Sequence, residues 1–238
     1  MSTKFSVIIP ARNEERVIGR CLESIRLAAE AYRGEVETIV VLNRCSDRTE
    51  EIARGFGAVT IREDARSLAR IRNAGARCAA GSMLVTIDAD STMTPRTLAA
   101  IDRALSTGRT VGGGTLVFPE RLSAGIVATF LVMLPVVLLN PVTGGLFWCR
   151  REDFAAIGGF NEDLVSGEDY DFALRLKTYG KSVGRPFSTL RGGHIVTSCR
   201  KFDEFGDWHL VRNPLLLWRL ATGGDGRAAD AYYYDVER

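Results

Sequence analysis

Short apolar runs alternate with helical segments through the first half of the chain, and this alternation restricts the fold more than any other feature. In chain order the segments are a strand at 5–9, a helix at 17–32, a strand at 38–42, a helix at 47–54, a strand at 59–61, a helix at 67–80 and a strand at 83–87. Strands separated by helices predict parallel β-α-β units with right-handed crossovers. We therefore expect an α/β fold with a mostly parallel central sheet flanked by helices.

Length and composition narrow the class of protein further. The 238 residues suit one large α/β domain, and 46% hydrophobic with 25% charged residues is typical of a globular protein. A net charge of +2 is too small to predict nucleic acid as a partner. The five cysteines form no C-x-x-C pair, and the N-terminus shows no signal peptide, so we expect free thiols and a cytoplasmic location.

Two apolar stretches in the second half raise the question of a membrane or a partner. No charged residue lies between Leu122 and Cys149, but Pro135 interrupts the apolar run 126–139, which is shorter than the roughly 20 residues of a spanning helix. We expect a buried or interfacial helix there. The segment 208–220 mixes tryptophan and leucine with arginine, as peripheral membrane contacts do. Core packing or a homodimer contact is the favoured alternative for both stretches.

A pair of carboxylates follows the fourth predicted strand, in Asp88-Ala89-Asp90. Ligands of parallel α/β sheets bind at the carboxyl ends of the strands, where these residues lie. Two carboxylates one residue apart suit Mg²⁺ or Mn²⁺. The alternative is a turn with solvated aspartates before the helix that begins near Pro95.

Four further groups could bind ligands or take part in catalysis. Glu168 and Asp169 precede a helix. One of these carboxylates could act as a general base, or both could simply be negative charges that the dipole of the helix favours at its N-terminus. The arginines of the helix at 67–80 could hold phosphate or form a solvated basic face. His194, after two glycines, could be a third metal ligand or a structural histidine. Arg200 belongs to a small basic cluster that could equally be a polar loop.

Taken in order, these segments resemble the family 2 glycosyltransferases with the GT-A fold. The matching segments are 6–15 (SVIIPARNEE), 43–49 (NRCSDRT), 70–75 (RIRNAG), 87–90 (IDAD), 157–162 (IGGFNE, preceded by Gly144-Gly145) and 167–171 (GEDYD, followed by Arg175). Each motif alone is short, but six in the right order are specific. The resemblance covers about residues 5 to 180.

The resemblance implies a metal-assisted, inverting transfer of a sugar from a nucleotide-diphosphate donor to an acceptor hydroxyl. It implies Asp169 as the catalytic base with Glu168 beside it, and Asp90 and Asp88 of the D-x-D motif as metal ligands. The donor pocket that it implies consists of Pro10, Arg12, Glu14, Asn43, Asp47, Arg70, Asp88, Ala89, Asp90 and Arg200. Many members carry two acidic residues at the positions of Leu42-Asn43; the Asn43 amide can still bond a base edge, but a uridine preference does not follow.

The same resemblance divides the chain into a GT-A domain and a tail. The expected parts are a nucleotide-sugar-binding half at 1–118, an acceptor-side half at 119–222 and a tail at 223–238. The candidate acceptor is a lipid-linked molecule or a glycan, and the sequence does not decide between them. The apolar stretches are compatible with a peripheral position at the inner face of a membrane.

Two other functions are alternatives to sugar transfer. A sugar-phosphate nucleotidyltransferase needs a glycine-rich loop after the first strand, whereas residues 10–14 contain no glycine, and no P-loop motif is present. A catalytically silent nucleotide-sugar-binding or scaffold protein would not need Asp88, Asp90 and Asp169 to be intact. Both alternatives are less consistent with the sequence than a glycosyltransferase.

Overall fold

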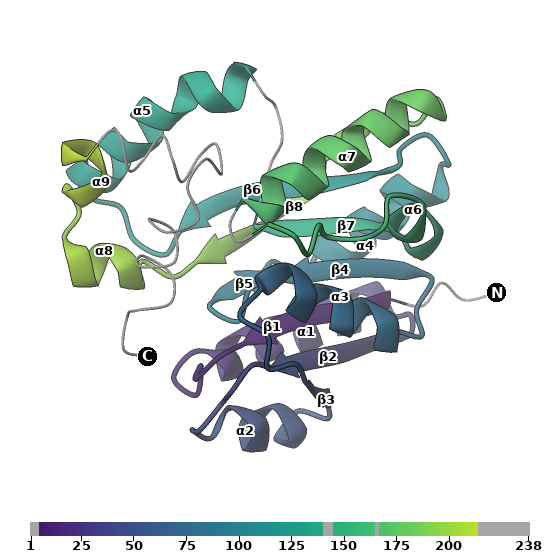
Figure 1. Ribbon diagram of the computed structural model, residues 1–238, viewed down its shortest axis with the longest axis horizontal. Helices are drawn as coiled ribbons and strands as arrows, with labels where there is room; N and C mark the ends of the chain where they lie inside the picture. The colour runs from purple at the N-terminus through teal and green to yellow at the C-terminus, as the bar shows by residue number, and fades with distance from the viewer. Residues whose placement is uncertain (1–4, 140–144, 165–166, 214–238) are drawn as a thin grey trace.

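An eight-stranded sheet in the order β3-β2-β1-β4-β7-β6-β8-β5 forms the centre of the computed structural model, which describes residues 5–139, 145–164 and 167–213 (Figure 1). The strands are β1 (Phe5–Ala11), β2 (Val36–Leu42), β3 (Val59–Arg62), β4 (Met83–Ile87), β5 (Ser91–Met93), β6 (Gly112–Pro119), β7 (Leu146–Arg150) and β8 (Phe187–Thr197). The helices are α1 (Ile18–Tyr32), α2 (Thr49–Gly55), α3 (Leu68–Cys78), α4 (Thr97–Ser106), α5 (Ala124–Leu139), α6 (Arg151–Ala156), α7 (Glu168–Ser182), α8 (Arg200–Phe205) and α9 (His209–Arg212).

The strands predicted from the first half of the sequence form the parallel part of the sheet. β1 pairs in parallel with β2 and β4, and β2 pairs in parallel with β3. Beyond β4 the sheet turns antiparallel at β7 and β6, and β8 then pairs in parallel with β6 and antiparallel with β5. Four of these seven pairings are parallel, so the predicted α/β class with a mostly parallel sheet is confirmed.

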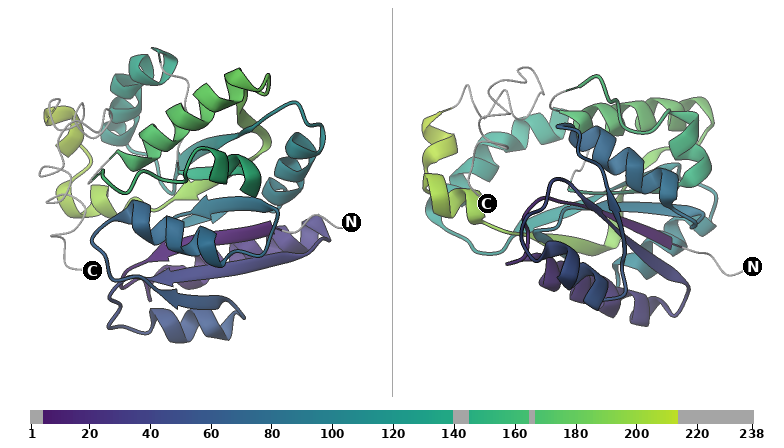
Figure 2. Two further views of the ribbon diagram at one scale, coloured as in Figure 1. Left: turned by 45° about the vertical axis from the view of Figure 1, so that its right-hand side comes forward. Right: turned by 60° about the horizontal axis from the view of Figure 1, so that its bottom comes forward.

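Helices cover both faces of the sheet, which explains why the central strands are apolar without alternation. On β1, Val7 and Ile9 face a core shared with α1, α2 and α4, whereas Ile8 faces a core shared with α3, α6 and α7. The two turned views show these layers, with α5, α8 and α9 set apart from the helices that cover the sheet (Figure 2). The parallel strands end on the same side of the sheet, and the loop that follows β1 lies beside α8 (Figure 1).

The apolar run 126–139 forms a helix as predicted, and of the two expected environments, buried or interfacial, most of its described side chains are not buried. Ile126 and Thr129 are buried, whereas Phe130 (45%), Leu131 (63%) and Leu134 (46%) are exposed. The helix packs against α9 rather than into the sheet. Among the described residues, no helix is both long and apolar enough to cross a membrane.

Several expectations fall partly or wholly outside the described residues. Gly144, the amphipathic segment beyond residue 213 and the tail at 223–238 lie there. The proposed boundary at residue 118 falls within β6, one residue before the strand ends, and the sheet continues across it through β7 and β8. All five cysteines carry free thiols, as expected.

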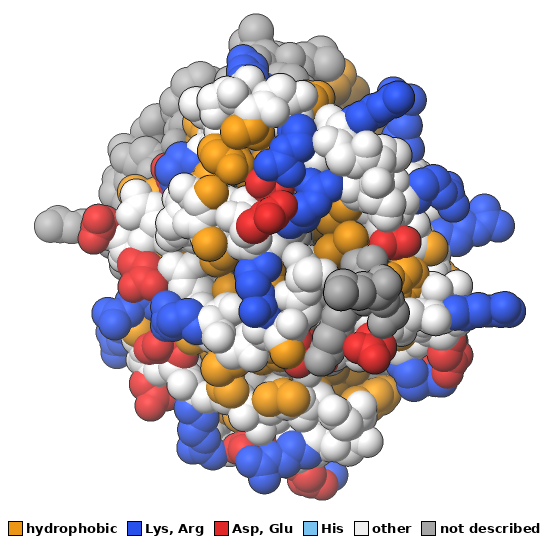
Figure 3. Space-filling view, turned by 90° about the vertical axis from the view of Figure 1, so that its right-hand side faces the viewer, with side chains coloured by type: hydrophobic (Ala, Val, Ile, Leu, Met, Phe, Trp, Pro, Cys, Tyr) orange, Lys and Arg blue, Asp and Glu red, His pale blue; other side chains and the backbone are white. Residues whose placement is uncertain are grey.

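Charged side chains of both signs are interspersed on the face opposite to α8 and α9 (Figure 3). Lys and Arg side chains project beside Asp and Glu, with small hydrophobic patches between them. This face carries no continuous basic surface of the kind that binds nucleic acid.

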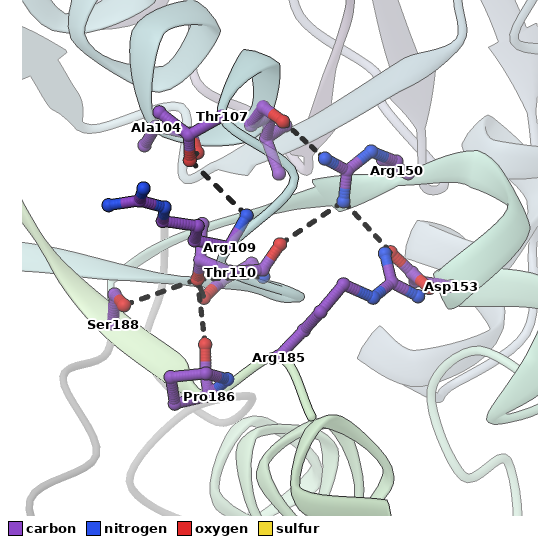
Figure 4. Close-up of polar contacts among 11 residues, drawn as sticks. Ala104, Thr107, Arg109, Thr110, Arg150, Asp153, Arg185, Pro186 and Ser188 are labelled. Atoms are coloured by element: carbon purple, nitrogen blue, oxygen red, sulfur yellow. Dashed lines mark hydrogen bonds and ion pairs between the residues drawn. The ribbon is translucent and has the colours of Figure 1, made fainter. Parts of the chain in front are cut away.

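A buried ion-pair cluster lies at the opposite end of the strands, where β7 ends beside the start of β4 (Figure 4). The Asp153 side chain is 1% exposed and accepts two hydrogen bonds from the Arg185 guanidinium, at 2.6 and 3.0 Å. Arg150 lies 3.5 Å from the same carboxylate and donates to the Thr110 carbonyl oxygen. The cluster therefore ties α6, β7 and the segment before β8 together.

Asp153→Ala should lower the free energy of unfolding by about 3–5 kcal/mol, because it leaves two partly buried guanidinium groups without their counter-charge. Urea titration measures this change. The matched control is Asp163→Ala, since Asp163 is exposed and should change stability by less than about 0.5 kcal/mol. Equal stabilities of the two variants would contradict a structural role for the cluster.

Candidate active site

One buried arginine organises the carboxyl edge of the sheet. The Arg72 side chain is 3% exposed and donates to Asp88 Oδ1 at 2.9 Å, Glu168 Oε1 at 3.0 Å and Asp169 Oδ1 at 2.5 Å. Its guanidinium also lies 5.2 Å from the ring centroid of Phe160. Residues separated by almost 100 positions in the sequence thus share one cation.

The position of Arg72 follows from the close packing of α3 on the sheet. Ser67 caps the helix by accepting a hydrogen bond from the Arg70 amide. A Cβ at Gly75 would lie 2.4 Å from Ile8 Cγ2, so glycine is needed where the helix crosses β1. Arg72 lies three positions before Gly75 on the same buried face.

The neighbouring Asn73 ties the acceptor-side loop to the same helix. Its amide nitrogen donates to the Phe160 carbonyl oxygen at 2.8 Å, and its amide oxygen accepts from the Phe160 amide at 2.9 Å. Arg175 donates to the carbonyl oxygens of Ile157 and Gly159, both at 2.7 Å. These bonds place Phe160 beneath the Arg72 guanidinium, stacked on Phe172 at 4.2 Å.

The D-x-D carboxylates follow β4 and lie at the centre of the site. The Asp88 side chain is 40% exposed and the Asp90 side chain 25%, while Ala89 is buried in the core below them. Ser198, at the end of β8, donates its amide to the Asp90 carbonyl oxygen at 3.1 Å. The chain after β8 is thereby held beside the D-x-D motif.

A second arginine bridges the D-x-D motif to the loop after β1. Arg200 Nη1 lies 2.8 Å from Glu14 Oε2, and Arg200 Nη2 lies 3.6 Å from Asp90 Oδ2. The Glu14 side chain is 5% exposed. Glu14, Asp90 and Arg200 are thus brought together.

The electrostatics of the site are dominated by carboxylates. Burial, with the nearby charges of Asp88 and Glu14, raises the pKa of Asp90 to about 6, against the opposing charge of Arg200. Burial also raises the pKa of Asp169 to about 7, against the opposing charge of Arg72. These are perturbations of the kind found where acid–base chemistry or ligand binding takes place.

Hydrogen bonds join the loops that follow β1 and β2, next to Glu14. Asp47 accepts hydrogen bonds from the amides of Glu15 and Thr49, and Glu14 donates its amide to the Thr49 hydroxyl. Pro10 and Arg12 lie at the end of β1 in the same region. Asn43 is buried and donates to the carbonyl oxygens of Glu63 and Ala65, so its amide N–H groups are used to shape this loop.

Two predicted site residues lie elsewhere in the structure. Arg70 projects from α3 with 54% of its side chain exposed, and its nearest carboxylate is Glu162 at 3.6 Å. His194 pairs with Thr94, four positions along β5 from Asp90, which corresponds to about 13 Å of strand. Within the described part of the chain, no group of three or more His, Cys, Asp or Glu residues is arranged as a metal site.

The sequence placed Arg72 and Asn73 in a basic helix and in the RIRNAG motif, but it assigned neither residue a role of its own in the site. The available signal was helical periodicity: Ala69, Arg72 and Gly75 recur at intervals of three, and the small residues mark the face that packs on the sheet. An arginine on that face has to be paired inside the protein.

Comparisons with known proteins identify the family of this chain. A sequence profile described as glycosyl transferase family 2 matches residues 6–124, half of the chain, and one described as an N-terminal domain of galactosyltransferase matches residues 139–198. The chain belongs to glycosyltransferase family 2. The matched region includes β1, α3 and the D-x-D motif.

Two curated relatives of this family 2 glycosyltransferase align over most of the chain. Glycosyltransferase AglE from Haloferax volcanii is 28% identical, with 90% of this chain and 74% of the relative covered. An uncharacterized glycosyltransferase from Haemophilus influenzae is 26% identical, with 72% of this chain covered. The aligned part spans 61% of the Haemophilus protein's length.

Solved structures of low sequence identity share the fold. Staphylococcus aureus TarS has a TM-score of 0.64 at 17% identity, covering 98% of this chain and 42% of the TarS chain. Glucosyl-3-phosphoglycerate synthase from Mycobacterium tuberculosis has a TM-score of 0.60 at 20% identity, covering 93% of this chain and 79% of the synthase. The GT-A architecture expected from the sequence is therefore confirmed.

Arg72→Ala should lower the free energy of unfolding by about 3–5 kcal/mol at pH 8, because the buried Glu168 then loses its counter-charge. Arg72→Lys should recover only part of this loss, since an ammonium group cannot reproduce the fork that reaches three carboxylates. Urea unfolding at fixed pH measures both variants. Arg70→Ala is the matched control and should change stability by less than about 1 kcal/mol; an equal effect at Arg70 would contradict the assigned role.

Proposed function

We propose that this glycosyltransferase moves a sugar from a nucleoside-diphosphate donor to an acceptor hydroxyl by a single inverting displacement. The observation that carries the proposal is the carboxylate cluster at the carboxyl edge of the sheet. The five carboxylates of Glu14, Asp88, Asp90, Glu168 and Asp169 form ion pairs with the two arginines Arg72 and Arg200, and Lys201 adds a positive charge near Asp90, so carboxylates are in excess over these cations. This excess favours a cation and a donor whose diphosphate binds to it.

The residues present fit a divalent cation held by Asp90 and Asp88. Both side chains are partly exposed at the same edge, and oxygen ligands of this kind suit Mg²⁺ or Mn²⁺. Burial and, after it, the charges of Asp88 and Glu14 raise the pKa of Asp90, and a bound cation would favour the ionised carboxylate. When bound, the cation neutralises charge that develops on the diphosphate leaving group. His194 is not part of this proposed ligand set.

Asp169 fits the role of general base. Arg72 holds its Oδ1 at 2.5 Å, whereas Oδ2 has no protein partner within the described residues, and 36% of the side chain is exposed. The Asp169 carboxylate would take the proton of the acceptor hydroxyl as that oxygen bonds to the anomeric carbon. The bond from this carbon to the diphosphate oxygen breaks on the opposite face, which inverts the configuration.

A uridine diphosphate donor is the first candidate to test. Structures of TarS in complex with UDP-GlcNAc and of glucosyl-3-phosphoglycerate synthase in complex with Mn²⁺ and UDP share the fold of this chain. Arg200 lies between Glu14 and Asp90, where it could pair with the donor diphosphate.

The exposed apolar side chains of α5 indicate which kinds of acceptor or partner the enzyme could bind. Phe130, Leu131 and Leu134 on α5 and Trp208 before α9 are each more than 40% exposed. Such a surface supports a lipid-linked acceptor, a peripheral membrane contact or a homodimer more than it supports core packing. A glycan acceptor remains compatible with the site itself.

Asp90→Asn should abolish the Mn²⁺-dependent part of UDP binding, because an amide is a weaker ligand for a hard cation and carries no charge. Isothermal titration of UDP with and without Mn²⁺ measures this effect. Asp163→Asn, at an exposed position, should bind UDP like the natural chain. Unchanged Mn²⁺-dependent affinity in Asp90→Asn would contradict the metal assignment.

Asp169→Asn should lower kcat by about 10²–10⁴-fold while donor binding persists, the usual effect of losing a general base. The natural enzyme should lose kcat/KM as the pH falls below about 7, because the base must be ionised and its pKa is raised to about 7. Initial rates between pH 5 and pH 9 measure both effects. An acid limb near pH 4, or near-normal turnover of the variant, would exclude Asp169 as the base.

A further inference from the structure

A second pocket lies outside the carboxylate site, between the start of α4 and a distorted part of β8. Its volume is about 980 Å³, within the range of small-molecule binding sites. The walls come from β6, β8 and the residues that precede α4. Nothing in the proposed transfer reaction uses this pocket.

The pocket is built by a bulge in β8. Gly114 pairs with Thr189 and Leu116 pairs with His194, so the single residue between them on β6 faces four residues on β8. Gly192 has a φ of +90°, and a Cβ at Gly193 would lie 2.8 Å from Thr97 Cα, so both positions require glycine. The bulge projects Arg191 to the pocket, as bulges commonly redirect side chains toward functional sites.

The pocket is lined by positively charged side chains and by no negatively charged ones. Arg96 and Arg191 both line it, and no aspartate or glutamate is among its lining residues. Neither guanidinium makes an ion pair with the described residues. Both arginines are exposed, so their guanidinium groups are accessible to a ligand, and planar donor groups of this kind match phosphate oxygens.

The remaining wall is apolar and exposed. Leu116 and Phe118 line the pocket and are 49% and 47% exposed. The His194 ring packs edge-on against Phe118, with centroids 5.0 Å apart at 79°, which fixes the orientation of both rings. Apolar surface beside two arginines suits a ligand with a hydrocarbon part and an anionic head.

We propose that this pocket binds an amphipathic phosphate monoester, with its phosphate on Arg96 and Arg191 and its apolar part on Leu116 and Phe118. The pocket is distinct from the donor site: Thr94 and His194, which line it, pair four positions along the β5–β8 ribbon from Asp90, about 13 Å away. Ligand in this pocket therefore leaves room for cation and nucleotide at the D-x-D motif.

The test is calorimetric titration of the full chain with dodecyl phosphate below its critical micelle concentration, a probe that is independent of turnover. We expect saturable one-to-one binding, weakened about 10-fold by Arg96→Gln and by Arg191→Gln, the effect of losing one charge-assisted contact. Arg109→Gln removes an exposed arginine outside the pocket and should bind like the natural chain. Equal affinity in all of these variants would overturn the proposal.

Two further arms identify the part of the probe that is recognised. Inorganic phosphate should bind at least 10-fold more weakly than dodecyl phosphate, and equal affinity would mean a simple anion site. Leu131→Ser, which removes an exposed apolar side chain of α5, should leave binding unchanged. Loss of binding in that variant would place the probe on α5 instead.

A competition arm tests whether the two sites are separate. Saturating UDP and Mn²⁺ should leave the affinity for dodecyl phosphate unchanged within about twofold. Displacement of the probe would place it in the donor site and overturn the proposal.

Discussion

The burial of the Arg72 guanidinium among three carboxylates is the interaction on which the site depends. A guanidinium removed from water has to be offset by charges and hydrogen bonds placed at short range. The partners come from the end of β4 and the start of α7, and the arginine itself comes from α3. Three elements from distant parts of the chain can therefore pack together only in the arrangement that also assembles the carboxylates.

In the same arrangement, the negative charge of the site is only partly neutralised by the arginines that pair with it. Arg72 compensates for part of the negative charge of Asp88, Glu168 and Asp169, and Arg200 compensates for part of that of Glu14 and Asp90. Burial first, and neighbouring carboxylates after it, raise the pKa values of Asp90 and Asp169. A cation and a diphosphate would complete the balance together, which links donor binding to the stability of this edge of the sheet.

The sequence predicted the sheet, and it placed candidate carboxylates at the ends of its strands, because both depend on local patterns. Apolar runs at strand length and polar residues just after them are visible without knowledge of tertiary contacts. The choice between Arg70 and Arg72 is not local: it depends on the angle at which α3 crosses β1, and that angle is set by the contact of Gly75 with Ile8.

Two other features escaped prediction for the same reason. His194 follows a bulge in β8 whose length appears only in the register between β6 and β8, so its separation from Asp90 is a tertiary property. The sequence left open whether α5 is buried or interfacial, because an apolar run has the same composition in a core and on a surface. What covers a helix is decided by the rest of the fold.

The most direct test of the account is thermal unfolding of the chain with UDP, GDP, CMP, dTDP and ADP, each with and without Mn²⁺. Ligand at about 100 times its dissociation constant adds roughly 2.7 kcal/mol, which raises the midpoint by about 5–10 °C for a domain of this size. The account predicts such a shift for at least one nucleoside diphosphate, and only when Mn²⁺ is present. No shift with any nucleotide, or an equal shift without the metal, would contradict the assignment of the carboxylate cluster as the donor site.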